Sequence, residues 1–322
     1  MRIGINPAKE NKEISIESYH RVVIPVYIPN LEEAYFKDGL KILKLCIESL
    51  LTTIHKKTRV SLINNACCDE VTFYLNMMYE QNSQIDQLLN SKVNLGKVNA
   101  LYSAIKSNLE PLITVADADV LFLNDWQNQV EDIFRFYPEA GMVSPVPSIG
   151  SLKGKFLKST LGFAFLNRSI KLEKVKNFEA IKNFQNSIGK TNKLDRETTK
   201  YYTTEKNKKK VVLGCGHFMV TLKASVFNNS PKEPSKYKIV GGSEKQYIDS
   251  PNDKSGFLKL ATVDNYGYHL GNKYECWMYN EFSNVLNKGN ISKDSDYDFN
   301  VSKPLKLYYY FGLIIQYLFY RK

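Results

Sequence analysis

One stretch of the chain, 112–123 with the sequence LITVADADVLFL, constrains the fold more than any other. Its mainly apolar start, 112–115, is typical of a strand covered on both faces, because such side chains suit the interior of a parallel sheet. Asp117 and Asp119 follow, and a second apolar run comes directly after them. Carboxylates at the end of a buried strand are costly unless a cation neutralises them, so the stretch predicts a sheet with a charged site at one strand end.

The Asp117–Asp119 pair suits a divalent cation. Mg²⁺ and Mn²⁺ accept few carboxylates and complete their coordination with phosphate oxygens and water. No lysine or arginine lies close to the pair in the sequence. We therefore expect a metal ion with a diphosphate on its far side. An Asp-rich turn after a strand is the alternative, because a D-x-D pattern alone is common.

The chain has 322 residues, of which 43% are hydrophobic and 24% charged, as is ordinary for a globular protein with a sizeable core. Its N-terminal residues, MRIGINPAKENKE, lack the apolar segment of a secretion signal. The five cysteines show no metal-ligand spacing, and Cys67 and Cys68 are adjacent. We expect reduced thiols in a cytoplasmic protein.

The positive charge of the chain is concentrated in one segment. Residues 151–210 hold 16 Lys and Arg against 5 Asp and Glu, whereas the rest of the chain is balanced, 28 against 28. Such a segment suggests an electropositive surface that faces phosphate, although a solvated lysine-rich excursion is the plainer alternative. It has few apolar residues, so we expect an insert or lid, not a separate domain.

Strand-like and helix-like segments alternate along the first half of the chain, and the strand-like ones end in polar residues. This alternation predicts a doubly wound α/β layer that binds its ligand at the carboxyl ends of the strands. The predicted strands cover 21–28, 58–64, 92–94, 112–115, 140–147 and 260–263. The predicted helices cover 38–54, the sequence from 69 to about 90, a segment that opens at 96–97, 125–137 and 172–187.

Four short motifs coincide with these strand ends. They are VVIPVYIPN, INNACCDE, NLGKVNALYSA and VADADVLF. In this order they resemble a family 2 glycosyltransferase of the GT-A fold, whose strands end in patterns such as V-I-I-P-x-Y/F-N, D-N/D-G-S-x-D, N-x-G-x-x-x-A-x-N and D-x-D. Tyr102 replaces the last asparagine of the third pattern.

The resemblance implies a GT-A fold, a Rossmann-like doubly wound mixed sheet with helices on both faces. It implies a single catalytic domain over 1–302. Within that domain we expect a nucleotide-binding half over 1–150, the basic insert 151–210 and an acceptor and catalytic half over 211–302. An amphipathic tail, 303–322, would follow.

The resemblance also implies a nucleotide-sugar site. Pro25 and Tyr27 would line the base pocket, and Asn64 stands where the family usually has an aspartate that accepts a hydrogen bond from uracil. An amide oxygen can still accept that bond. The full set of nucleotide-sugar residues is Pro25, Tyr27, Asn64, Asn65, Asp69, Asn94, Lys97, Asp117 and Ala118.

The metal ligands implied by the resemblance are Asp119, Asp117 and His269. Asp119 would bind the ion directly, and Asp117 would contact either the ribose or the ion. His269 lies in YGYHLGN, where many GT-A enzymes have a late histidine. The expected cofactor is a divalent metal, either Mn²⁺ or Mg²⁺. Neutral imidazole suits Mn²⁺ better than Mg²⁺.

The acceptor side and the catalytic base fall in the second half by the same resemblance. Gly214 and Gly216 would let the backbone approach a sugar closely, and His217 would either bind substrate or end a strand as an ordinary histidine. The block GGSE resembles a family pattern in which a G-G pair precedes two acids, the second of which is the base of inverting members. Glu244 takes that place, and Asp249 is the rival base.

The resemblance implies a metal-dependent, inverting glycosyltransferase that moves a sugar from a nucleotide-diphosphate sugar to a hydroxyl of a glycan or lipid-linked glycan, in bacterial surface polysaccharide assembly. A retaining or non-catalytic GT-A protein is an alternative. A nucleic-acid-binding protein that uses 151–210 is another, but this segment has no recognised motif and we expect no nucleic acid. Sugar-nucleotide pyrophosphorylases share a similar sheet, but the chain lacks their Gly-rich loop with Arg and Lys after the first strand.

The tail from 304 to 322, PLKLYYYFGLIIQYLFYRK, is aromatic and aliphatic with basic ends. Its apolar run is too short for a bilayer span, which needs ~20 residues. Tyrosine and phenylalanine between basic residues suit a helix at a membrane surface, so we expect a peripheral protein at the inner face of the cytoplasmic membrane. A terminal helix that docks on the domain or on a dimer partner is the alternative.

Overall fold

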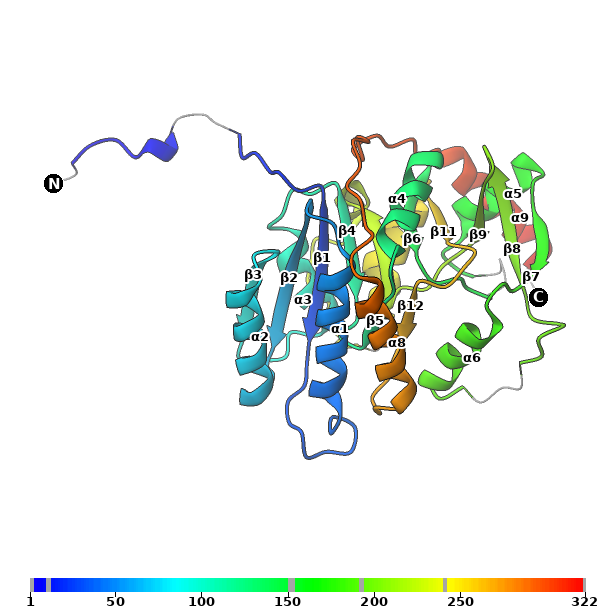
Figure 1. Ribbon diagram of the computed structural model, residues 1–322. Coiled ribbons are helices and arrows are strands. Elements are labelled where there is room, and N and C mark those ends of the chain that lie inside the picture. Colours follow the sequence, from blue (N-terminus) through cyan, green and yellow to red (C-terminus); the bar gives the residue numbers. More distant parts are fainter. Residues whose placement is uncertain (1–2, 10–12, 150–153, 191–193, 240–241, 321–322) are drawn as a thin grey trace.

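A computed structural model describes residues 3–9, 13–149, 154–190, 194–239 and 242–320. A mixed sheet of ten strands forms its centre, in the order β3-β2-β1-β4-β10-β6-β11-β9-β8-β7, with a separate two-stranded sheet of β12 and β5 (Figure 1). This arrangement confirms the predicted α/β class with a mixed sheet, and it is consistent with a Rossmann-like architecture.

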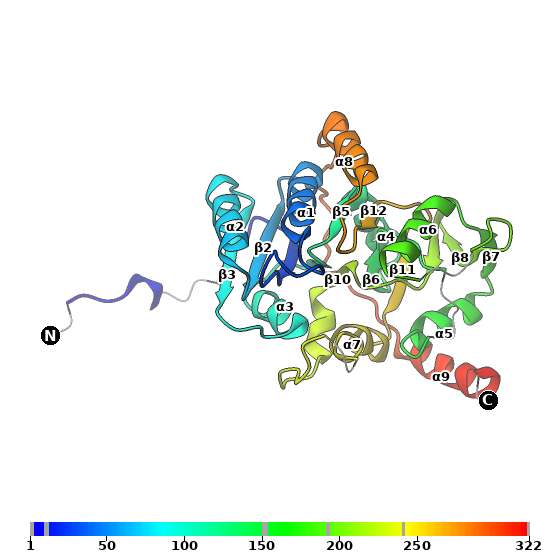
Figure 2. The same ribbon diagram turned by 90° about the horizontal axis from the view of Figure 1, so that it is seen from below.

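Parallel strands from the first half build one side of the sheet. They are β1 (His20–Val26), β2 (Thr58–Asn65), β3 (Ile85–Ser91) and β4 (Leu112–Ala116). β1 lies between β2 and β4 and is parallel to both. Val22, Val23 and Ile24 are inaccessible to solvent, as the continuous apolar pattern predicts for a strand covered on both faces. The carboxyl ends of these strands therefore meet at one edge, which faces the viewer in Figure 2.

Helices cover both faces of the sheet (Figure 2). Buried side chains of α1, α2 and α4 join one core cluster, whereas those of α3 join another with the 3₁₀ segment η2. Each amphipathic helix places its apolar stripe on the sheet. The bounds are α1 (Gly39–Thr53), α2 (Asp69–Gln81), α3 (Lys97–Ile105), α4 (Trp126–Phe136) and η2 (Ala224–Asn229).

The prediction for residues 69 to 94 is wrong in its second part. α2 ends at Gln81, where the Asn82 amide donates to the carbonyl of Met78 (2.8 Å). The strand β3 then runs from Ile85 to Ser91, and the expected strand 92–94 is a loop. β3 is an edge strand and is only partly buried, so its sequence IDQLLNS lacks the apolar run that identified its neighbours.

The second half adds strands of both directions. β10 (Met219–Lys223) is antiparallel to β4 on one side and to β6 (Ala140–Ser144) on the other. β11 (Leu258–Ala261) is parallel to β6. β5 (Val120–Phe122) leaves the main sheet and pairs with β12 (Gly267–His269).

The basic segment contributes its own strands to the same sheet. β9 (Lys209–Leu213) pairs with β11, and β8 (Lys200–Lys206) and β7 (Lys171–Lys174) follow outward to the edge. The expected helix 172–187 is therefore half wrong: α6 (Phe178–Ser187) begins only after Asn177, whose side chain accepts from the amide of Ala180. α5 (Lys158–Asn167) precedes these elements. Residues 151–153 and 191–193 of the segment lie outside the described residues.

The C-terminal helix α9 (Lys306–Tyr320) packs along α5, beside the short helix α7 (Ser250–Lys254) (Figure 2). Gly162 of α5 and Gly312 of α9 make this contact close, because a Cβ at either position would collide with a carbonyl oxygen of the other helix. No helix in the described part of the chain is long and apolar enough to cross a membrane. The remaining elements are η1 (Pro7–Lys9), the π-helical turn η3 (Lys245–Asp249) and α8 (Cys276–Lys288). All five cysteines are free thiols.

Candidate functional site

Three predicted metal ligands meet at the carboxyl edge of the sheet. Asp117 directly follows β4, Asp119 directly precedes β5, and His269 ends β12. The antiparallel register pairs His269 with Val120, which places the imidazole beside Asp119, with Nε2 3.4 Å from Oδ2. The ligand atoms of the three side chains lie within 4.8 Å of one another.

Burial raises the pKa of the Asp119 carboxyl to about 6. The charge of His269 opposes this rise, whereas the charge of Asp117 adds to it. Two carboxylates and an imidazole close together form a donor set that Mn²⁺ accepts well and Mg²⁺ less well.

Lys97 connects this trio to a second acid. Its ammonium forms ion pairs with Asp117 and with Glu244 Oε1, the latter at 2.5 Å. Burial disfavours the ammonium, but the charges of Asp117 and Glu244 outweigh that effect and raise the pKa of Lys97. The backbone holds Lys97 at the start of α3: its amide donates to the Lys238 carbonyl (2.7 Å), and Gly96 before it has φ +80° and no room for a Cβ.

Glu244 lies between two cationic groups. His217 Nε2 is 3.2 Å from Glu244 Oε2, on the side opposite the Lys97 pair. Burial alone would raise the pKa of Glu244, but the hydrogen bond from His217 and the charge of Lys97 hold it at about 2. Burial lowers the pKa of His217, but the same hydrogen bond together with the charges of Glu244 and Asp249 outweighs that effect and raises the pKa. Glu244 is therefore a carboxylate with one oxygen on His217 and the other on Lys97.

Asp249, the rival base, has a different partner. Its Oδ1 is 2.9 Å from the ammonium of Lys259, which is buried, and its Oδ2 is 3.8 Å from His217 Nδ1. Asp249 is itself buried and is the last residue of the π-helical turn η3. Its carboxylate neutralises a buried lysine, a role that needs it to stay in place.

The predicted asparagines stabilise the loops that surround the site. Asn64 donates to Thr72 and Asn90 and accepts from the amide of Cys67, each at 3.0 Å. Asn65 joins the next loop, since its amide donates to Asn94 Oδ1 (3.1 Å) and its oxygen accepts from the Leu95 amide. The structure thus gives both amide hydrogens of Asn64 to protein partners.

The other predicted residues lie at varied distances from the carboxylates. Tyr27, just past β1, is 38% exposed and packs edge-on against Phe36. Asp69 is exposed at the start of α2, in a groove with Leu40 and Lys44. Pro25 lies within β1, Ala118 lies between the two aspartates and packs on the core, and Gly241 of the G-G pair lies outside the described residues.

Gly214 and Gly216 precede His217 in the loop between β9 and β10. Gly214 has φ +94°, which favours glycine. A Cβ at Gly216 would touch only Phe218, at 3.9 Å, so this position has open space beside it.

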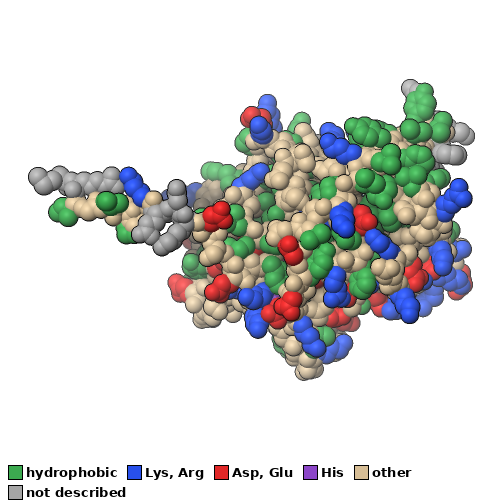
Figure 3. Space-filling view, turned by 90° about the horizontal axis from the view of Figure 1, so that it is seen from above, with side chains coloured by type: hydrophobic (Ala, Val, Ile, Leu, Met, Phe, Trp, Pro, Cys, Tyr) green, Lys and Arg blue, Asp and Glu red, His purple; other side chains and the backbone are tan. Residues whose placement is uncertain are grey.

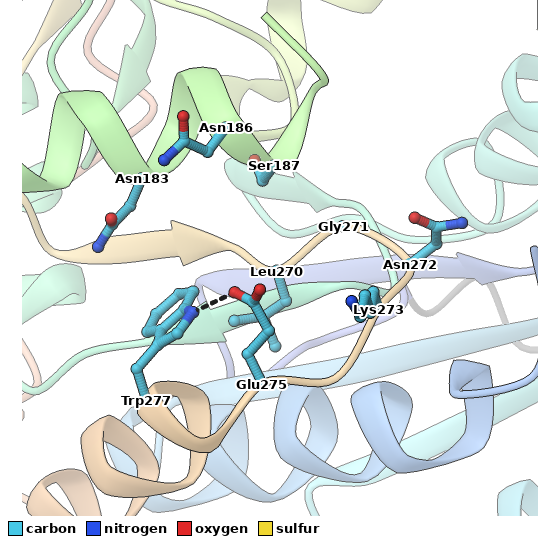
Figure 4. A pocket seen from close by; sticks show the side chains of 9 residues that line it. All are labelled: Asn183, Asn186, Ser187, Leu270, Gly271, Asn272, Lys273, Glu275 and Trp277. Atoms are coloured by element: carbon cyan, nitrogen blue, oxygen red, sulfur yellow. Dashed lines mark hydrogen bonds between the residues drawn. The ribbon is translucent and has the colours of Figure 1, made fainter. Parts of the chain in front are cut away.

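A polar cavity of about 210 Å³ lies beside the trio (Figure 4). Ser187 forms part of its wall and its hydroxyl is 3.0 Å from His269 Nδ1. Figure 4 shows α6 side chains on one side, facing the loop after β12 and the start of α8, where Trp277 donates to Glu275 (2.7 Å). Sequence motifs gave no signal for this cavity, because its residues come from two segments, 183–187 and 270–277, that lie far apart in the chain. The lining residues are Asn183, Asn186, Ser187, Leu270, Gly271, Asn272, Lys273, Glu275 and Trp277.

Comparison of the chain with protein-family models and with curated protein sequences finds no match.

Proposed function

We propose that this protein is a GT-A glycosyltransferase that moves a sugar from a nucleotide-diphosphate sugar to a hydroxyl of a glycan or lipid-linked glycan. The observation that carries the proposal is the convergence of Asp117, Asp119 and His269 with Lys97 and Glu244 at the carboxyl edge of the sheet. In an open α/β sheet, ligands bind outside this edge.

Asp119, His269 and Asp117 would hold Mn²⁺ or Mg²⁺. The fit rests on the closeness of their ligand atoms and on the burial of the Asp119 carboxyl beside a second carboxylate, which raises the pKa of Asp119. When bound, the cation would stabilise the negative charge that develops on the departing diphosphate.

Lys97 would contact the diphosphate of the donor. Its ammonium lies between Asp117 and Glu244, so it already faces the position next to the metal ligands. A diphosphate oxygen that attracts this ammonium would weaken its ion pair with Glu244. Loss of that ion pair raises the pKa of Glu244 and so makes the carboxylate a stronger base.

Glu244 would take the proton of the acceptor hydroxyl on Oε1 as the hydroxyl oxygen attacks the anomeric carbon. His217 holds Oε2, which fixes the carboxylate and directs Oε1 towards the site. The bond between the anomeric carbon and the diphosphate oxygen breaks on the opposite face of the sugar ring, and the nucleoside diphosphate leaves. The product therefore has inverted anomeric configuration. Asp249 is less suited to this role because it neutralises Lys259.

A thermal-shift panel with UDP, GDP, CDP and dTDP sugars, with and without Mn²⁺, tests the proposal. We expect one nucleotide class to raise the melting temperature only with metal, and Asp119→Ala to abolish the shift. Asp132→Ala is the matched control, because Asp132 is a partly exposed acid on α4 that pairs with Arg135 and Lys209. Equal shifts in excess EDTA would contradict the metal role, and no shift with any nucleotide sugar would contradict the function.

A further inference from the structure

A second cavity, of about 570 Å³, lies where α5, α7 and α9 come together. Its walls bear both basic and aromatic side chains. We call it the lysine cleft, defined by Lys155, Lys158, Lys245, Lys254 and Tyr309.

The charge of the lysine cleft is strongly positive. Within the described residues, no carboxylate pairs with Lys155, Lys245 or Lys254, and all three are exposed. One acid lines the cleft: Asp253, whose Oδ2 is 3.7 Å from the ammonium of Lys158. Burial raises the pKa of the Asp253 carboxyl, and this single acid stands against four lysines in the cleft. Several unpaired ammonium groups around one cavity favour a phosphate-bearing ligand.

The lysine cleft borders the segment that carries the proposed base. Gly242 and Lys245 line the cleft, and Glu244 lies between them in the chain. Gly242 has φ +74° and open space around it, which leaves the cleft wall free of a side chain at this point. A ligand in the cleft is therefore next to the acceptor side of the proposed site.

The helix α9, which lines the lysine cleft through Tyr309, also presents an apolar face to solvent. Tyr309 lines the cleft, whereas Gly312 and Ile315 pack against α5 and the core. Figure 3 shows hydrophobic side chains gathered at the corner where the chain ends. The exposed apolar residues of α9 include Leu307, Tyr310, Leu313, Ile314 and Leu318, of which Leu318 is 67% exposed.

We propose that the lysine cleft binds the phosphate or diphosphate head of a lipid-linked acceptor, whose hydrocarbon chain lies along the exposed face of α9. This inference rests on the proposed glycosyl transfer, because it names the acceptor of that reaction. Charge and apolar surface meet at Tyr309, so one amphipathic molecule covers both. The arrangement also places the sugar end of such an acceptor near Glu244.

The test measures binding of dodecyl phosphate by calorimetry, with inorganic phosphate and dodecyl maltoside as partial ligands. We expect dodecyl phosphate to bind more tightly than either. Two variants should each lower the affinity for dodecyl phosphate at least tenfold. The triple variant carries Lys155→Gln, Lys245→Gln and Lys254→Gln, and the double variant carries Leu313→Ser and Ile314→Ser. Only the triple variant should lower the affinity for inorganic phosphate.

Matched variants control for general loss of charge or apolar surface. Lys37→Gln, Lys92→Gln and Lys288→Gln together remove three exposed lysines elsewhere, and Phe73→Ser removes an apolar side chain that is 73% exposed on α2. None of these lowers dodecyl phosphate binding. Unchanged melting temperatures would confirm that the cleft and α9 variants are folded. If the triple variant does not fold, the single variant Lys245→Gln takes its place.

Three outcomes would overturn the inference. Wild-type affinity for dodecyl phosphate in the triple variant would show that the lysines do not bind the phosphate. Wild-type affinity in the double variant would show that the hydrocarbon chain does not lie along α9. Binding to vesicles that contain phosphatidylglycerol, with no binding of dodecyl phosphate in solution, assigns the lysines to a membrane surface instead. A dimer in sedimentation that Leu313→Ser, Ile314→Ser dissociates assigns the face to a second copy. The metal-dependent nucleotide shift is measured on the same variants, so failure of the donor site is seen separately.

Discussion

Lys97 determines the charge balance of the site, because its ammonium is shared by two carboxylates from distant segments. The resemblance of the first half to a glycosyltransferase pattern assigned Lys97 to the nucleotide-sugar site. Its pairing with Glu244 could not be predicted, since the two residues lie on segments with no sequence relation. The convergence of Asp117, Asp119 and His269 was easier to predict, because two of them share a short motif and all three lie at strand ends.

The variant Glu244→Gln keeps the size of the side chain but cannot take a proton at neutral pH. We expect sugar transfer to fall by roughly 10²–10⁴-fold, the usual worth of general-base catalysis. Donor binding is expected to survive, because the metal ligands are other residues. Rates come from single-turnover assays, and donor binding comes from calorimetry.

The matched control for this prediction is Asp249→Asn, which keeps the ion pair between Glu244 and Lys97 but removes a carboxylate charge 3.8 Å from His217. It removes a charge from buried Lys259, so its stability must be measured beside its rate. A folded Asp249→Asn protein with a large loss of transfer, together with a near wild-type rate for Glu244→Gln, would reverse the assignment.

Lys223, in the central strand β10, is a buried lysine with no acid partner among the described residues. Its ammonium donates to the carbonyls of Pro138 (2.8 Å) and Val301 (2.6 Å), which ties the segment before α9 to the sheet. Burial lowers the pKa of Lys223 to about 8, and the charge of Glu139 only partly opposes this.

The lowered pKa of Lys223 predicts a pH dependence of the free energy of unfolding. Between pH 8 and the ordinary lysine pKa the unfolded chain binds more protons than the folded one, so this residue adds stability as pH rises. Relative to Lys223→Met, the wild type should gain about 2–3 kcal/mol between pH 7 and pH 10. Urea unfolding at both pH values measures the difference, and a constant difference would show an ordinary pKa.

At the scale of elements, the sequence predicts strands well where apolar runs are continuous and poorly at the sheet edges. β1, β2 and β4 are buried on both faces and were predicted within a few residues. The edge strands β3 and β7 are partly exposed, so polar residues interrupt their patterns and both were assigned to helices. Which helices pack together depends on contacts between distant residues, and α5 with α9 is an example.

The α5–α9 contact predicts the effect of a small substitution. Gly312→Ala places a methyl group against the carbonyl of Lys158, so the helices must separate. We expect a loss of roughly 1–3 kcal/mol in the free energy of unfolding, as is usual for overpacking. Gly216→Ala is the control, because its Cβ would meet only Phe218 at 3.9 Å. Equal urea midpoints for the two variants would show that α9 does not pack on α5 in solution.

At the scale of the whole molecule, the distribution of charge separates the proposed enzyme from a nucleic-acid-binding protein. The net charge of +11 is that of the basic segment 151–210, but many of its lysines are paired. Among the described residues, acids outside the segment pair with four of them: Asp264 at 2.8 Å, Glu139 at 3.0 Å, Asp132 at 3.4 Å and Asp253 at 3.7 Å. Acids within the segment pair with others, such as Lys210 with Glu173. The sequence count therefore overstates the charge available to bind phosphates.

We expect no saturable binding of a fluorescent 20-base-pair DNA duplex up to about 10 µM protein at roughly 0.1 M salt. Proteins that bind DNA non-specifically do bind it in this concentration range. The double variant Asp132→Asn, Glu139→Gln frees Lys209 and Lys206 from their partners and should increase DNA binding at low salt. Fluorescence anisotropy at several salt concentrations measures both proteins. Because each phosphate contact adds about 0.9 to the slope of log affinity against log salt, a steep slope for the wild type would contradict the prediction. We therefore expect the pairing of these lysines with acids to keep the chain from binding DNA.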